Sequence, residues 1–127
     1  SARLISTVDA AGTRQSITTA GGTDNRVTTN LTGDNGNVNI NVMGATNYID
    51  ITQSGVGGST GHQAVMDING NGNTVTTNQS GASGNSLTIN NIGAGNTISA
   101  TQNGVTNANS ATINVTGNNA SVSVIQH

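Results

Sequence analysis

The residue types that most often carry out chemistry are few and scattered in this chain. Its carboxylates are single residues, and no two of them stand at equivalent inward positions where they could work as a general acid/base pair. They are Asp9, Asp24, Asp34, Asp50 and Asp67. His62 and His127 have no partners at the spacing of metal ligands, so we interpret both as surface histidines. We therefore predict no enzymatic activity, no cofactor, no metal site and no small-molecule substrate.

Glutamine, in contrast, recurs at a fixed place. The segment from Asn73 to Gly81 (NTVTTNQSG) has similar copies from Asn47 to Gly55 (NYIDITQSG) and from Asn96 to Gly104 (NTISATQNG). In each copy an Asn opens, a Gln follows six residues later and a Gly eight residues later, with apolar residues or Thr at the second and fourth places after the Asn. Because side chains alternate faces along a strand, this pattern predicts strands that bury their Gln.

A buried Gln amide without partners costs roughly 1 to 3 kcal/mol, so something must satisfy it. If the copies stack in register at the strand spacing of about 4.8 Å, each amide donates to one neighbour and accepts from the other. The repeat therefore predicts an amide ladder along the stack. Its Gln members are Gln53, Gln79, Gln102 and Gln126.

Two kinds of strand alternate along the chain. One kind carries the Gln, and the other carries Val42, Ile68, Asn91 or Val115 at the same place. The inward positions of both kinds predict the apolar core: Val38, Ile40, Val42, Ile49, Ile51, Met66, Ile68, Val75, Leu87, Ile89, Ile98, Ile113, Val115, Val122 and Val124. Turn glycines follow the strands: Gly33, Gly44, Gly55, Gly70, Gly81, Gly93, Gly104 and Gly117.

The glycine spacing predicts one tight bend and one variable connection in each coil. Eleven residues separate Gly44 from Gly55, and the same number separates Gly70 from Gly81, whereas the spacing between coils varies. We predict an all-β, cross-β solenoid with two strands per turn, rungs of about 11 residues and roughly five coils of about 22 to 26 residues. Residues 1–24 are predicted to be degenerate first rungs and residues 25–127 the regular repeats. Asn-Gly pairs favour an antiparallel meander as the alternative, but a meander gives no reason for Gln in alternate strands only.

The composition limits the functional classes. Only 31% of the residues are hydrophobic, but 6% are charged, the net charge is -2 and Pro is absent, which is not typical of a disordered chain. The only basic residues besides His are Arg3, Arg14 and Arg26, so no basic stripe for nucleic acid exists. Cysteine is absent, and no apolar run approaches the length of a membrane span.

The strand from Ser121 to His127 lacks the devices that protect sheet edges. It alternates cleanly and contains no Lys, no Pro and no bulge signal. We predict that its open edge is a template for the next copy of the chain, which would make a cross-β fibre by end-to-end stacking. The predicted polymerisation edge consists of Ser121, Val122, Ser123, Val124, Ile125 and Gln126.

These units, an Asn or Ser followed by five residues, Gln, one residue and Gly, resemble curlin repeats, the subunits of curli-type amyloid fibres of bacteria. The resemblance covers about residues 25–127. It implies a secreted protein that is nucleated at the cell surface and polymerises outside the cell into fibres for biofilm matrix and adhesion, with a secretion pore and a surface nucleator as partners. It also assigns to the core ladder Asn47, Asn73, Asn85, Asn96 and Asn109. We include Asn91 in the predicted ladder as well, because its amide stands at a Gln place of the repeat.

The chain departs from curlin in ways that keep another class open. Curlin has Gln on both strands of a repeat, whereas Ile68, Asn91 and Val115 stand at half of these places, and the only aromatic residue is Tyr48. Outward Thr residues such as Thr74 and Thr76 form short T-x-T rows. The alternative function is therefore a monomeric or trimeric β-solenoid binding module, such as an ice-binding protein or a phage-fibre or adhesin stalk.

Overall fold

The computed structural model of the protein describes residues 3–8, 14–20, 23–32, 35–55, 61–82, 84–105 and 107–127. Asp9, Asp34 and the predicted turn residue Gly33 lie outside these ranges. The described residues are all-β, with no helix that could span a membrane. Their strands are β1 (Arg3–Val8), β2 (Arg14–Ala20), β3 (Arg26–Leu31), β4 (Asn37–Met43), β5 (Tyr48–Gln53), β6 (Gln63–Asn69), β7 (Thr74–Ser80), β8 (Ser86–Ile92), β9 (Thr97–Asn103), β10 (Ser110–Thr116) and β11 (Ser121–Gln126).

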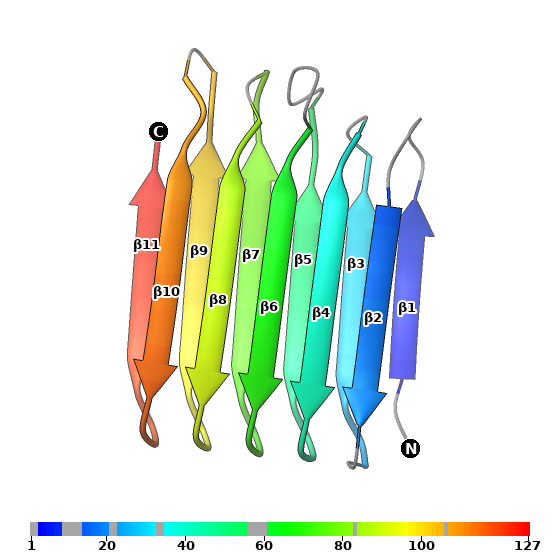
Figure 1. Ribbon diagram of the computed structural model, residues 1–127, viewed down its shortest axis with the longest axis vertical. Coiled ribbons are helices and arrows are strands. Elements are labelled where there is room, and N and C mark those ends of the chain that lie inside the picture. The colour runs from blue at the N-terminus through cyan, green and yellow to red at the C-terminus, as the bar shows by residue number, and fades with distance from the viewer. Residues whose placement is uncertain are drawn as a thin grey trace.

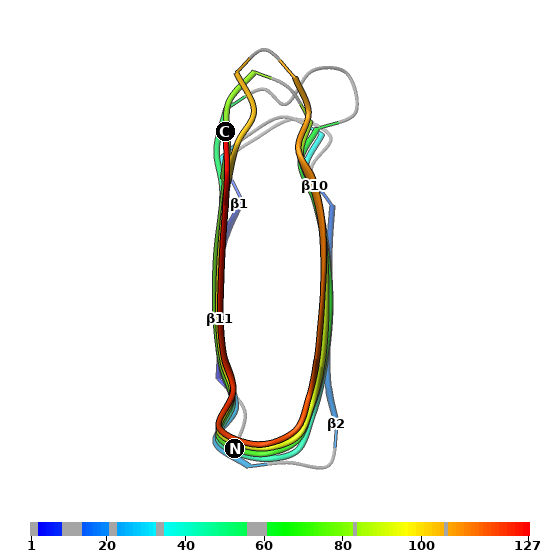
Figure 2. The same ribbon diagram turned by 90° about the vertical axis from the view of Figure 1, so that its left-hand side faces the viewer.

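Odd-numbered and even-numbered strands lie in two separate sheets. The six-stranded sheet has the order β1-β3-β5-β7-β9-β11, and the five-stranded sheet has the order β10-β8-β6-β4-β2. All neighbouring strands are parallel, and the chain crosses to the other sheet after every strand (Figure 1). Viewed along the stack, the coils superimpose (Figure 2). The prediction of a β-solenoid with two strands per turn is therefore confirmed, and the antiparallel alternative is wrong.

Equivalent residues of successive coils stand directly beside each other. Asn25 and Asn47 are 22 residues apart, and Asn47 and Asn73 are 26 residues apart, which are the limits predicted for a coil. The extra residues fall in the connections that lead from the six-stranded to the five-stranded sheet. Strand β5 ends at Gln53 and β6 begins at Gln63, whereas β4 ends at Met43 and β5 begins at Tyr48. The strands therefore keep one register although the coils differ in length.

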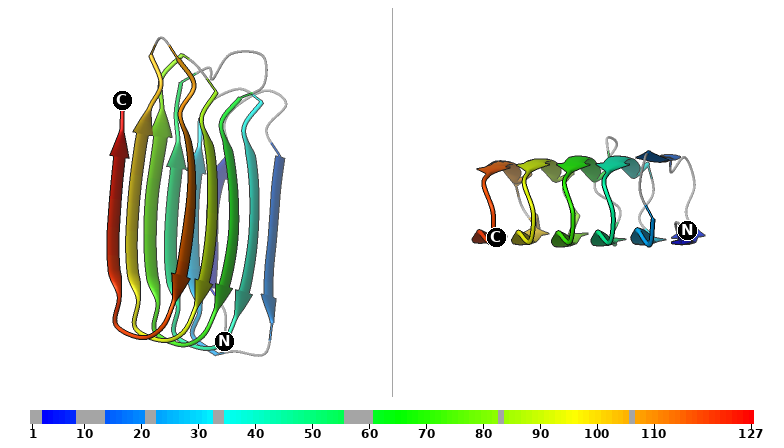
Figure 3. Two further views of the ribbon diagram at one scale, coloured as in Figure 1. Left: turned by 60° about the vertical axis from the view of Figure 1, so that its left-hand side comes forward. Right: turned by 90° about the horizontal axis from the view of Figure 1, so that it is seen from below.

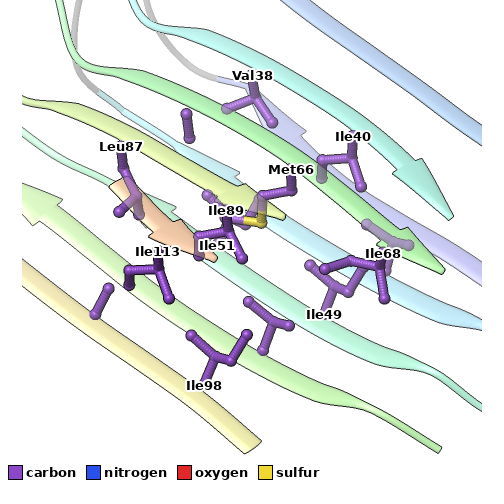
Figure 4. Close-up of a cluster of buried hydrophobic side chains, with 14 of the residues drawn as sticks. Val38, Ile40, Ile49, Ile51, Met66, Ile68, Leu87, Ile89, Ile98 and Ile113 are labelled. Atoms are coloured by element: carbon purple, nitrogen blue, oxygen red, sulfur yellow. The ribbon is translucent and has the colours of Figure 1, made fainter. Parts of the chain in front are cut away.

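A thin core lies between the two sheets, because every second side chain of the strands from β3 to β11 points inward (Figure 4). Ile40, Ile51 and Met66 are fully buried in it, and Met66 is the register partner of Ile40. Val122 and Val124 are only partly buried, since β11 is an edge strand. All other residues predicted for the apolar core are buried, and the core also contains Val27, Leu31, Ala64 and Ala100.

The first two strands continue the same registers. Leu4 of β1 pairs with Val27 of β3, so β1 belongs to the six-stranded sheet. In β2, Ile17 pairs with Ile40 and packs against the core. The glycine spacing favours a register one residue away for this segment, and the structure instead places Ile17 inward because that adds an apolar side chain to a continuous row.

The tight bends between even and odd strands also stack on one another. The Gly70 N–H donates to the carbonyl of Met43 at 2.9 Å, and the Gly93 N–H donates to the carbonyl of Asn69 at 2.9 Å. Gly70 has a φ of 141°, a region that favours glycine, and a Cβ there would lie 1.9 Å from the Gly93 oxygen. Glycine is therefore required at this place by both the backbone conformation and the next coil.

Candidate functional site

The predicted Gln residues form one continuous row of amides inside the solenoid. The Gln53 Nε2 donates to the Gln79 Oε1 at 2.7 Å, and the Gln79 Nε2 donates to the Gln102 Oε1 at 2.9 Å. The Gln102 Nε2 then donates to the Gln126 Oε1 at 2.8 Å. All bonds point in the same direction, so the row has a donor end towards β11 and an acceptor end towards β1.

Three of these amides also join the two sheets. A second hydrogen bond runs from the Gln79 Nε2 to the backbone oxygen of Gln63 at 2.9 Å, across the core. The Gln102 and Gln126 amides make the same bond to the backbone oxygens of Ser86 and Ser110, both at 3.0 Å. A Gln amide has only two N–H donors, and in Gln79 and Gln102 both are used within the stack. The Gln row therefore holds coil to coil and sheet to sheet.

The two ends of the Gln row differ. At its start, Gln53 stands beside Leu31 of β3, and its buried Oε1 has no hydrogen-bond partner. At its other end, Gln126 lies on the edge strand β11 and is half-buried. By the geometry of the preceding members, one N–H of Gln126 faces the open end of the solenoid. The row is thus closed by an apolar residue on one side and open on the other.

A second polar row of Asn residues lines the tight bends. The Asn47 Oδ1 accepts the backbone N–H of Asn73 at 3.0 Å, and the Asn47 Nδ2 donates to the Gly70 oxygen at 2.8 Å. Asn73 repeats both bonds with Asn96 and Gly93. Each Asn thus satisfies one backbone donor and one backbone acceptor of the coil above it, which explains why Asn opens the repeat.

The Asn row has one more member than we predicted and a defined end. Asn25 is buried and makes the same bonds to the Asn47 N–H and the Gly44 oxygen. Its signal in the sequence is its place two residues before Val27, the place that Asn73 takes before Val75. The row ends at Ala120, whose N–H donates to the Asn96 Oδ1 at 2.8 Å.

Asn91 does not stack on other amides. Its register neighbours are Ile68 and Val115, so the prediction that it belongs to the amide ladder is wrong. Its Oδ1 instead accepts the Nδ2 of Asn96 from the other sheet at 2.9 Å, and its own buried Nδ2 has no partner. The apolar neighbours on both sides leave a cross-core bond as the only contact that its amide makes.

A third polar row contains His62, Asn85 and Asn109. The Asn109 N–H donates to the Asn85 Oδ1 at 3.1 Å, and the Asn85 N–H donates to the His62 Nδ1 at 3.1 Å. His62 is 1% exposed, so its interpretation as a surface histidine is wrong. It occupies an Asn place in the repeat, and its ring is covered by the coils above and below it.

The contacts of His62 select its neutral form. Its Nδ1 accepts the N–H of Asn85, and its Nε2 then carries the proton towards the backbone oxygen of Ser54, 2.8 Å away. Burial lowers the pKa of His62 below its ordinary value of 6.5, although backbone hydrogen bonds at Ser54 and Gly81 act in the opposite direction. The folded state therefore binds protons less readily than the unfolded chain at this residue.

We expect the stability of the solenoid to fall in mild acid because of His62. The unfolded state binds the proton at about 6.5, so the stability contribution is fully present above this pH and decreases as the pH falls below it. In a His62→Asn variant the new amide can donate to the Ser54 oxygen, as Asn85 does to Ser80. Urea unfolding between about pH 7 and pH 5 should show a smaller decrease for the variant than for the natural chain. Equal decreases would contradict this role of His62, because His127 is present in both.

The carboxylates of the described residues are spread over different faces. Asp50 lies on the outer face of the six-stranded sheet, Asp67 on the outer face of the five-stranded sheet, and Asp24 in a bend. Within the described ranges, no three His, Cys, Asp or Glu residues are grouped so that they could hold a metal ion. The polar groups that the fold brings together are amides, and their chemistry is hydrogen bonding along the stack.

The β11 end of the solenoid exposes the cross-section of the core. Ile98 and Ala100 of β9 are each 1% exposed, whereas their register partners Val122 and Val124 of β11 are only half-buried. Ser121, Ser123 and Ile125 point outward from the same strand and are exposed. The predicted polymerisation edge thus consists of one whole edge strand with an apolar inner face, an open backbone edge and the end of the Gln row.

The predicted turn glycines occupy two kinds of bend. Gly44, Gly93 and Gly117 share the tight bend and the positive φ of Gly70. Gly55 and Gly81 also have positive φ and lie in the other connections, which Gly104 shares. Close stacking of bends therefore depends on glycine on both sides of the solenoid.

The fold and its interior define a class of protein, a parallel β-solenoid repeat protein with internal amide rows. Protein-family models, curated proteins and solved structures were compared with this chain, and none matches it. The functional interpretation therefore depends on the residues and on the geometry of the open end.

Proposed function

We propose that this chain is the structural subunit of an extracellular, curli-like functional amyloid fibre and that it assembles with copies of itself end to end. The observation that carries the proposal is the open β11 end. There the half-buried Val122 and Val124, the unpaired backbone edge and the donor of Gln126 are left uncovered at the end of the stack. A further coil of the same kind would bury all three.

The absence of edge protection supports self-assembly. Proteins that stay monomeric usually use Lys, Pro or a bulge to protect the edge strands of their sheets from pairing. The two edge strands at this end, β10 and β11, contain neither Lys nor Pro, and they keep a continuous register with β8 and β9. An unprotected parallel edge is a template for another strand, and repeated addition gives a cross-β fibre.

The resemblance to curlin supports the biological setting of this proposal. We infer that the protein is secreted by a bacterium through a dedicated pore, nucleated at the cell surface and used in biofilm matrix and adhesion. The physical requirement is that the chain reaches the outside before it stacks, since the same open edge would assemble inside the cell.

One observation favours a second candidate function. On the outer face of the six-stranded sheet, Thr74 and Thr97 stand in one row, and Thr76 and Ser99 stand in the next. Flat rows of hydroxyl groups suit binding to ice. Tyr48 and Asp50 interrupt these rows at β5, so we place this function second.

Fibre formation is the direct test. Purified chain at neutral pH should form unbranched fibres in electron micrographs, and aligned fibres should diffract at about 4.8 Å along the fibre axis. A chain that stays monomeric and shows thermal hysteresis would instead favour ice binding, and a stable trimer would favour a stalk.

Two lysines on the inner face of β11 should abolish assembly. In the variant Val122→Lys/Val124→Lys, each ammonium group would have to be buried between stacked coils, which costs several kcal/mol per unpaired charge. The variant should remain folded by circular dichroism, because only the edge strand changes, and should give no fibres.

The matched control places the same charges on the outer face of the same strand. In Ser123→Lys/Ile125→Lys both side chains point to solvent, so the apolar end remains intact and fibres should still form. Abundant fibres from the inner-face variant would contradict the role proposed for this end.

A further inference from the structure

The two sheets of the solenoid contain different numbers of strands. Among the described residues, six strands form one sheet and five form the other, and β1 and β11 are both edges of the six-stranded sheet. The view from below shows the five-stranded row set between the ends of the six-stranded row (Figure 3). A whole number of coils would need equal numbers of strands in the two sheets, so the part of the solenoid from β1 to β11 contains half a coil in excess.

This excess matters when two copies join end to end. If β11 of one copy paired with β1 of the next, the six-stranded sheet would continue, but the two copies would bring only ten strands to the other sheet, which would then have eleven positions. The edge strands β10 and β2 would lie about 9.6 Å apart, twice the spacing of neighbouring strands. One strand would be missing from that sheet, and the core between Ile113 and Ile17, which stand in one register row, would be open.

Continuity of both sheets requires a different joint. If β11 of one copy takes the place of β1 on β3 of the next copy, then β10 falls beside β2 at the normal spacing. Each copy then contributes five strands to each sheet, and the solenoid runs on without a gap. We propose that the fibre grows by this strand replacement, in which the incoming β11 displaces β1. This inference rests on the proposed function and names the contact by which the copies join.

The register shows that β11 suits the place of β1. In β1, Arg3 is the register partner of Arg26, so two arginines occupy neighbouring positions of the register. In β11, Ser121 stands at the position that corresponds to Arg3. Replacement would therefore put an uncharged residue beside Arg26, and like charges at paired positions are unfavourable.

The register rows of the buried residues Val27, Thr29 and Leu31 allow the exchange, and one of the three favours it. Ser6 is the register partner of Thr29, and replacement would put the apolar Val124 at this position. Val122 would replace Leu4, which keeps an apolar residue at that position. In the third row Gln126 would replace Val8 beside Leu31, while its bonds to Gln102 and Ser110 would remain. Gln126 meets an apolar residue in either joint, so this row does not distinguish them.

A disulfide that fastens β1 to β3 tests the proposal. Ile5 and Thr28 are register partners, and neighbouring strands about 4.8 Å apart lie within the usual Cα separation of a disulfide. The chain has no natural cysteine to interfere. The oxidised variant Ile5→Cys/Thr28→Cys should lose sustained growth on natural-chain seeds, and reduction should restore it. Equal growth of the oxidised and reduced forms would overturn strand replacement.

The matched control fastens two interior strands on the same outer face. Thr76 and Ser99 are register partners in β7 and β9 and are both exposed. The variant Thr76→Cys/Ser99→Cys should grow equally well oxidised and reduced. If neither double variant grew even when reduced, and the natural chain formed no fibres, the proposed function itself would fail and the inference with it.

Cross-linking between copies distinguishes the two joints directly. Fibres are grown from an equal mixture of Ser123→Cys with Thr28→Cys and, separately, of Ser123→Cys with Ile5→Cys. Strand replacement predicts an intermolecular disulfide between positions 123 and 28, identified by mass spectrometry of the digested fibre. A disulfide between positions 123 and 5 in its place would overturn replacement while leaving end-to-end assembly intact.

Discussion

Gly70→Ala is expected to lower the free energy of unfolding by at least about 3 kcal/mol. An added Cβ would lie 1.9 Å from the Gly93 oxygen, far inside van der Waals contact. That oxygen also accepts the Asn73 Nδ2 at 2.9 Å, so moving it away breaks a bond of the Asn row. The backbone φ of 141° adds strain for any side chain. Urea unfolding monitored by circular dichroism measures the loss.

The control for this prediction is Gly117→Ala. Gly117 occupies the same place in the last bend with a φ of 135°, but a Cβ there meets nothing within 4 Å. Its substitution should therefore cost only the conformational strain, about 1 to 3 kcal/mol. If both substitutions cost the same, contact between stacked bends would not be what requires glycine.

The architecture could be predicted because one polar residue type recurs where a polar residue is costly. A buried Gln every 23 to 26 residues has few ways to satisfy its amide, and stacking on its own kind is the simplest of them. The apolar residues around Gln79, such as Val75, then set the inward face, and a one-residue slip would expose them. Repeated residues thus specified both the sheets and their register.

The individual polar contacts were harder to predict, because each depends on what lies in the neighbouring coil. Asn91 has the right residue type for a ladder, but Ile68 and Val115 are its neighbours. His62 breaks the Asn pattern and lies within the longest interval between predicted turn glycines, from Gly55 to Gly70. Its place in a row therefore becomes evident only from its bond to Asn85. In β2 the pattern alone left the register open, and the pairing of Ile17 with Ile40 decides it.

The half coil in excess could not be predicted from the repeat alone. Residues 1–24 have too irregular a pattern to reveal whether they contribute one strand, two or none. Pairing of Leu4 with Val27 and of Ile17 with Ile40 shows that they contribute two, one to each sheet. The strand β2 alone would have given five strands in each sheet, so the presence of β1 makes the strand numbers unequal. The joint between copies therefore depends on whether β1 keeps its place.

Gln79→Leu should cost more stability than Gln53→Leu, by about 1 to 3 kcal/mol, although the two substitutions are chemically identical. Removing Gln79 leaves two buried groups without partners, the Gln53 Nε2 and the Gln102 Oε1, and it also removes the bond to the backbone oxygen of Gln63. Both Gln side chains are fully buried, so burial does not distinguish them.

Removing Gln53 has a smaller cost because Gln53 is the first member of the row. Its substitution deprives only the Gln79 Oε1 of a donor, and it also removes the Gln53 Oε1, which already lacks a partner. Leu31 stands at this place one coil earlier, so the new side chain has a precedent in the same row. Equal losses in urea unfolding would mean that the amides act independently. A larger loss for Gln79 would establish that the stability of each amide depends on its neighbours, which is the property that an added copy would extend.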